Sequence, residues 1–102
     1  MTLAVYRITF APVIRSFRNR ALRRYFEQGD PSGLSVPNIA RVGRILRALD
    51  AATRPEQLNL PGFYWHALQG VERWTIRVTG NWRITFGWDG ADAVGVDLED
   101  YH

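Results

Sequence analysis

Residues 73–88, which read RWTIRVTGNWRITFGW, decide the fold of this chain. Apolar and polar side chains alternate on both sides of Gly80-Asn81, which is the pattern of two half-buried strands joined by a tight turn. The apolar positions are Trp74, Ile76, Val78, Trp82, Ile84, Phe86 and Trp88. Because alternate side chains of a strand share a face, the sequence predicts an antiparallel hairpin with one face on a core and the other open.

The register of this hairpin follows from its two apolar rows. Both rows meet the same core only if the numbers of paired residues have an even sum, because a slip of one residue moves a whole row to the other face. This favours a three-residue loop over residues 79–81, closed by Val78 opposite Trp82. The same register places Arg77 directly opposite Arg83.

Two arginines that face each other across a sheet repel unless an anion lies over them. Arg77 and Arg83 therefore form a candidate phosphate site on the open face of the hairpin. An alternative is that carboxylates of the next strand neutralise the pair. The available carboxylates are Asp97, Glu99 and Asp100.

The other elements are predicted outward from the hairpin. Strands are predicted at 63–68, 73–78, 82–88 and 93–98, and residues 13–17 have strand-like composition. A helix is predicted over 18–29, ending at Gly29. A second helix, capped by Ser35 with Pro37 in its first turn, carries one apolar stripe. That stripe consists of Ile39, Val42, Ile45, Leu46 and Leu49. Two helices packed on a twisted antiparallel sheet make an α+β domain.

The composition indicates one globular, basic domain. The 102 residues are 46% hydrophobic and contain no cysteine, which excludes disulfides and thiol catalysis. All 13 basic residues are arginine, and residues 1–54 carry ten of them against three acids. Arginine binds phosphate and carboxylate through a planar fork, so this half predicts contact with nucleic acid or an acidic protein. A genome that encodes basic surface as arginine would explain the missing lysine but not the asymmetry.

The chain contains no apolar run long enough to span a membrane and no signal-peptide pattern at its start. We therefore expect a cytoplasmic protein with no membrane contact.

His66 and His102 are the natural proton carriers, because an imidazole titrates near neutral pH. They could serve as base and acid in one reaction. Each also has an ordinary interpretation: His66 lies in an aromatic strand and could simply pack, and His102 could be a frayed chain end.

Aromatic side chains beside arginines can stack unpaired bases. Trp74, Trp82 and Trp88 share a face with the predicted core and are better explained by packing. Tyr101 is the better candidate for stacking or hydrogen bonding to a ligand.

Five blocks together resemble the HigB-type toxins, a branch of the RelE/ParE superfamily. The blocks are VIRSF, RALRRYFEQG, LRALDAAT, VTGNWRITF and the terminal EDYH, in order over residues 13–102. The resemblance implies a RelE-like fold and ribosome-dependent endoribonuclease activity on mRNA. It also implies a helix-turn-helix antitoxin similar to HigA, and the toxin would reach operator DNA only through this antitoxin. The expected partners are thus antitoxin, ribosome and mRNA.

The family's functional residues fall on matching positions of this chain. In the reaction implied by the resemblance, a ribose 2′-hydroxyl attacks the adjacent phosphate without a metal or other cofactor. The resemblance makes His102 the principal acid or base, His66 its counterpart or a phosphate contact, and Arg83 the charge stabiliser. Asp100 and Tyr101 would orient His102 and the RNA.

The chain departs from the family pattern next to His66. Gln69 replaces a frequent active-site lysine, and the connection after it is shortened. Loss of that positive charge puts the rate, the codon preference or the activity itself in doubt. Arg73 or Arg77 would then compensate, so we include Gln69, Arg73 and Arg77 as RNA contacts.

The two ends of the chain raise separate questions. If the last strand continued unbroken, Asp100 and His102 would share the apolar face of Val94, Val96 and Leu98, so we expect regular pairing to end near Leu98. At the other end, residues 1–12 precede the resemblance, and Val13 fits an internal start codon. We expect residues 1–12 to be a dispensable and possibly non-native extension, with an extra strand as the alternative.

Two other functions compete with the ribonuclease. The chain could be a toxin-fold protein that has lost catalysis and only binds its antitoxin. It could also be a basic nucleic-acid-binding module, although the sequence shows no element that would read the major groove of DNA.

Overall fold

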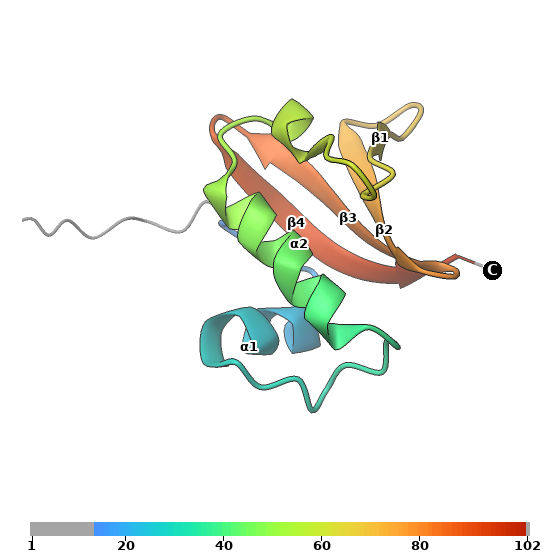
Figure 1. Cartoon of the computed structure of the whole chain (residues 1–102). Coiled ribbons are helices and arrows are strands. Elements are labelled where there is room, and N and C mark those ends of the chain that lie inside the picture. The colour runs from blue at the N-terminus through green and yellow to red at the C-terminus, as the bar shows by residue number, and fades with distance from the viewer. Residues whose placement is uncertain (1–13, 102) are drawn as a thin grey trace, which may run out of the picture.

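In the computed structural model, which describes residues 14–101, a four-stranded antiparallel meander is covered on one face by helices (Figure 1). The sheet order is β1-β2-β3-β4, so each strand pairs with its neighbour in sequence. The elements are α1 (Arg20–Gln28), α2 (Ile39–Ala51), the 3-10 helix η1 (Pro55–Leu58), β1 (His66–Ala67), β2 (Arg73–Thr79), β3 (Trp82–Asp89) and β4 (Asp92–Asp100). The predicted α+β fold, two helices on an antiparallel sheet, is confirmed.

Side-chain caps define the starts of both helices. Asn19 accepts a hydrogen bond from the Leu22 backbone N–H at 2.9 Å, and Gly29 ends α1 in the left-handed region with φ 72°. The prediction that Ser35 caps the second helix is wrong. Asn38 caps it by accepting from the Arg41 N–H at 3.1 Å. The helix begins later because Val36, just before a proline, stays outside the helix and is buried in the core.

The core lies between α2 and the helix-facing side of the sheet (Figure 1). The apolar stripe of α2 and the apolar row of the hairpin meet there, as predicted. Its fully buried large side chains include Leu22, Val42, Ile45, Leu49, Ile76, Ile84 and Phe86. Trp74, Trp82 and Trp88 are half-buried against this cluster, which agrees with a packing role.

The β2–β3 hairpin has the predicted register over most of its length. Arg73 pairs with Gly87 and Arg77 with Arg83, so the sum of paired numbers is even, but Thr79 pairs with Trp82. The predicted three-residue loop is therefore wrong. A register shift between Arg77 and Thr79 keeps Val78 buried and leaves Gly80-Asn81 as a two-residue turn, with Gly80 at φ 51°.

The first strand is much shorter than the predicted 63–68. Only His66–Ala67 forms β1, paired with Thr75 and Trp74. The cause is Tyr64, whose φ of 53° is a left-handed conformation that interrupts strand geometry. The chain rejoins β2 before this residue, where the Phe63 carbonyl accepts from the Arg77 N–H at 3.0 Å.

A β-bulge at Gly95 changes which residues of β4 face the core. Gly87 pairs with Val94 but Thr85 pairs with Asp97, so β4 has one extra residue between these pairs. Ala93 and Val96 are consequently buried, and Val94 is only half-buried. The expected apolar row of Val94, Val96 and Leu98 is corrected to Ala93, Val96 and Leu98.

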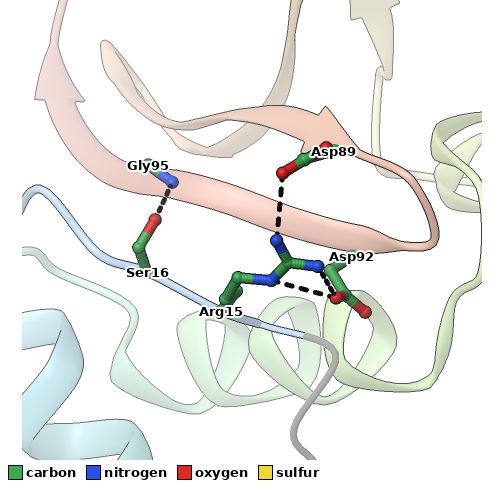
Figure 2. Close-up of polar contacts among 5 residues, drawn as sticks. All are labelled: Arg15, Ser16, Asp89, Asp92 and Gly95. Atoms are coloured by element: carbon green, nitrogen blue, oxygen red, sulfur yellow. Dashed lines mark hydrogen bonds and ion pairs between the residues drawn. The ribbon is translucent and has the colours of Figure 1, made fainter.

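Residues 14–18 hold the bulged edge of β4, and we call this segment the N-terminal clamp. Ile14 and Phe17 form parallel bridges with Ala93 and Val96. Figure 2 shows Arg15 between Asp89 and Asp92, with Nη1 3.0 Å from Asp89 Oδ2. In the same view the Gly95 N–H donates to Ser16 Oγ at 2.8 Å. The clamp thus pairs with the outer edge of β4 and satisfies the Gly95 N–H at the bulge. Residues 1–12, expected to be dispensable, lie outside the described part of the chain.

Candidate active site

The face of the sheet opposite the helices carries two arginines in direct opposition. Arg77 on β2 and Arg83 on β3 are register partners, as predicted. No hydrogen bond or ion pair joins either guanidinium to Asp97 or Glu99 within residues 14–101. Glu99 is nevertheless the register partner of Arg83 on the neighbouring strand. Its carboxylate therefore lies on the strand beside Arg83 without forming an ion pair with it.

Arg83 is positioned by the hairpin and by the end of β4. Its Nη1 donates to the carbonyl oxygens of Gly80 at 2.8 Å and Trp82 at 3.0 Å. Its guanidinium carbon lies 5.6 Å from the centre of the Tyr101 ring. These contacts fix the head group without neutralising it, so its positive charge remains available to an anion.

Arg77 has a corresponding aromatic partner on its other side. Its guanidinium carbon lies 5.5 Å from the centre of the Tyr64 ring. The backbone below it is fixed by Arg41 of α2, whose Nε donates to the Arg77 carbonyl at 3.0 Å and whose Nη2 bonds the Gly62 carbonyl. An open groove of about 490 Å³ runs beside this pair. It is lined by Arg41, Gly62, Tyr64, Arg77, Val78, Thr79 and Gly80.

Arg73 organises the carboxylate next to Arg83. Its Nη2 donates to Thr85 Oγ1 at 3.1 Å and to the Gly95 carbonyl at 2.8 Å. The Thr85 hydroxyl in turn donates to Glu99 Oε2 at 2.5 Å. Burial lowers the pKa of Arg73, and the nearby Arg18 lowers that pKa further. This network binds Glu99 through Thr85, which explains why Glu99 does not pair with Arg83.

His66 lies on the same open face. It is exposed on β1 opposite Thr75, and Thr75 is two residues from Arg77 along β2. Because alternate residues share a face, His66 and Arg77 are diagonal neighbours. Gln69 is exposed in the turn between β1 and β2, outside the strand row that contains the arginines.

The end of β4 differs from the expectation. Pairing does not stop near Leu98 but continues to Asp100, which lies opposite Trp82. The register therefore puts Asp100 on the face of Leu98, while Tyr101 lies with Arg83 and its N–H donates to the Asn81 carbonyl at 2.8 Å. Asp100 and Tyr101 thus point to opposite faces. His102, the main candidate for proton transfer, lies outside the described residues.

The positions of two groups at this site could not be predicted from the sequence. The sequence predicts a regular strand through Tyr64, and nothing in the neighbouring residues indicates its left-handed conformation. Thr85 lies in the polar row of the hairpin, so its face could be predicted. Its hydrogen bonds to Arg73 and Glu99 could not, because they depend on where the long Arg73 side chain reaches. Among residues 14–101, no cluster of three or more His, Asp or Glu side chains could hold a metal ion.

Comparison with known proteins identifies the family. A family model described as "RelE-like toxin of type II toxin-antitoxin system HigB" matches residues 15–102. A curated relative, Endoribonuclease HigB of Proteus vulgaris, is 38% identical over 92 residues, covering 88% of this chain and 100% of the relative. The chain belongs to the HigB family of RelE-like toxins. As a member of a toxin-antitoxin family, this HigB-like toxin has an antitoxin as its partner.

Proposed function

We propose that this HigB-like toxin is a ribosome-dependent, metal-independent endoribonuclease that cleaves mRNA. The observation that carries the proposal is the opposed pair Arg77 and Arg83 on the open face, which no carboxylate of Asp97 or Glu99 binds. Two guanidinium groups in this position create a site for a phosphate, and the Proteus relative is named an endoribonuclease.

Arg83 supplies the charge stabilisation in this mechanism. When the ribose 2′-hydroxyl attacks the adjacent phosphate, the phosphorus passes through a pentacovalent dianion. A guanidinium whose position is already fixed stabilises that charge without reorganising. Arg83 meets this requirement because backbone carbonyls and the Tyr101 ring hold its head group.

His102 and His66 carry the protons. One group accepts the proton of the attacking 2′-hydroxyl and another protonates the 5′-oxygen that leaves, so the reaction needs no metal. We assign His102 as the principal acid or base and His66, on the Arg77 face, as its counterpart or a phosphate contact. Tyr101 orients the RNA from its place over Arg83. Asp100, which ends β4 two residues before His102 in the sequence, would orient His102, and Gln69 would contact RNA from the β1–β2 turn.

The helices offer a second basic surface, away from the phosphate site. Arg20, Arg24 and Arg44 are exposed on α1 and α2. We assign this surface to ribosomal RNA or to an acidic segment of the antitoxin. The antitoxin is a helix-turn-helix protein similar to HigA that contacts operator DNA itself. The toxin acts in the cytoplasm, where translated mRNA lies. Within residues 14–101, no helix has the length and apolar character of a membrane span.

The decisive experiment is to express the protein in bacteria with and without the gene that neighbours its own, and to map new mRNA 5′ ends. We expect growth arrest and new 5′ ends within translated messages when the toxin is expressed alone. Coexpression of the antitoxin should remove both effects. Antitoxin binding without any new 5′ ends would support an inactive toxin-fold protein instead.

A further inference from the structure

Tyr64 combines a costly backbone conformation with an exposed aromatic ring. Its φ of 53° lies in the left-handed region, which glycine adopts freely but which is an outlier for a residue with a bulky side chain. The residue is nevertheless 66% exposed, the largest exposed fraction among the large hydrophobic residues described. Burial of the ring therefore does not account for the strained backbone.

The strained conformation has one clear structural result. It turns the chain out of the strand between Phe63 and His66 and places the ring against the Arg77 guanidinium, 5.5 Å from its carbon. The exposed remainder of the ring borders the groove of about 490 Å³ beside Arg77. The ring therefore lies next to a cation and beside a space that a ligand can enter.

Tyr64 also completes a row of four side chains across the sheet. Tyr64 precedes β1, Arg77 and Arg83 are register partners on β2 and β3, and Tyr101 follows β4. The Arg83 guanidinium lies 5.6 Å from the Tyr101 ring, so each arginine has its own tyrosine on the outer side. The order is aromatic, cation, cation, aromatic, which suits a phosphate in the middle and a base at each end.

We propose that Tyr64 and the groove beside it form a base-stacking subsite that holds one unpaired nucleobase of single-stranded RNA, with the adjoining phosphate over Arg77 and Arg83. This inference rests on the proposed ribonuclease function and adds a second stacking platform to Tyr101. Stacking uses the π-face that every base shares, so this subsite binds RNA without selecting a particular base.

The substitution Tyr64→Gly tests the subsite with little danger to the fold. Glycine adopts φ near 53° freely, so this variant removes the ring and also removes the backbone strain. We expect its melting temperature to stay the same or rise. Tyr64→Asn is a second variant of this kind, because asparagine tolerates the left-handed region. Tyr64→Phe keeps the ring and removes only the hydroxyl.

Binding is measured by fluorescence anisotropy of a labelled 2′-O-methyl RNA oligonucleotide of mixed sequence, whose blocked 2′-oxygen prevents cleavage. At one fixed salt concentration, Tyr64→Gly and Tyr64→Asn should bind about 5-fold to 100-fold more weakly than wild type, the usual effect of losing one base stack. Tyr64→Phe should bind like wild type. Val71→Gly, which removes another exposed apolar side chain from the β1–β2 turn, is the matched control and should also bind like wild type.

Three results would overturn the subsite. The first is unchanged binding by Tyr64→Gly, and the second is equal loss by Tyr64→Phe, which would assign the effect to the hydroxyl. The third is that Tyr64→Gly and Tyr64→Asn lose antitoxin binding while they still bind RNA like wild type, which would make the groove a protein interface. If wild type binds RNA and creates new mRNA 5′ ends while Tyr64→Gly matches it in both, the subsite alone is wrong. Absence of new 5′ ends with wild type rejects the ribonuclease function itself.

Discussion

An arginine lies at each end of β3: Arg15 contacts Asp89 at one end, and Arg83 follows Trp82 at the other. The two arginines differ in the groups that bind their guanidinium. At the Asp89 end, Arg15 of the N-terminal clamp is bound by two carboxylates, Asp89 and Asp92. At the Trp82 end, Arg83 is bound by two backbone carbonyls, while Glu99 beside it is engaged by Thr85. An arginine paired with acids joins segments of the fold, whereas an arginine held by neutral groups keeps its charge for a ligand.

The first prediction has the largest expected effect, and it tests whether a reaction takes place at the Arg83 end of the sheet. Deleting His102 should lower cleavage about 10²-fold to 10⁴-fold, the range for a lost general acid or base. A terminal side chain contributes little to a core, so stability and antitoxin binding should not change. Primer extension on translated message, a thermal melt and an antitoxin pull-down measure these three quantities. Normal cleavage by the deletion variant would remove His102 from the mechanism.

The second prediction compares the two arginines directly. Arg83→Ala should reduce cleavage by about 10²-fold or more, as when one transition-state donor is removed. Arg77→Ala should have a smaller effect, because Arg77 contacts the phosphate without carrying the developing charge. Arg15→Ala changes the net charge equally and is the matched control: it should lower the melting temperature slightly and leave cleavage per folded molecule unchanged.

Equal cleavage by the folded Arg83→Ala and Arg15→Ala variants would contradict the assignment of the open face. The melting temperature of each variant must be measured beside its activity, because loss of fold would imitate loss of catalysis.

Most of the fold could be predicted because it depends on short-range patterns. The alternation in residues 73–88 established the strands and the Arg77–Arg83 opposition, and apolar periodicity established the helices. The pattern does not determine where a strand gains a residue. The bulge at Gly95 needs the clamp and Arg73 to satisfy its backbone groups, and both partners are distant in sequence.

The site was predicted less completely for the same reason. Register or family resemblance predicts Arg83, Arg77 and Tyr101 as site residues, and they remain candidates. The position of Tyr64 against Arg77 could not be predicted, because it depends on one backbone dihedral angle. Asp100 is also a candidate, but strand pairing that continues to Asp100, opposite Trp82, places it on the other face from Tyr101.

The third prediction concerns the clamp. Ile14→Val removes one methylene from a side chain that is buried against β4, and such changes typically cost about 0.5–1.5 kcal/mol in the free energy of unfolding. Urea denaturation measures the change. Cleavage per folded molecule should equal that of wild type, since the clamp joins segments of the fold and lies outside the proposed RNA site. A cleavage defect that exceeds the loss of folded protein would show that the clamp also acts on the site.

The smallest effect is expected from removing residues 1–12. The described contacts of the clamp begin at Ile14, and the bridges to Ala93 and Val96 remain in a chain of residues 13–102. The family model matches residues 15–102, so residues 1–12 lie outside the matched region. We therefore expect a change within about 0.5 kcal/mol in the free energy of unfolding, the usual range for changes away from packed features. Toxicity should also be unchanged.

The alternative is that alternating Tyr6, Ile8 and Phe10 form an extra strand, in which case the truncated chain would melt at a clearly lower temperature. Urea denaturation and growth arrest, measured on the same pair of proteins, distinguish the two: a large loss of either would show that the N-terminal region of the fold starts before the clamp.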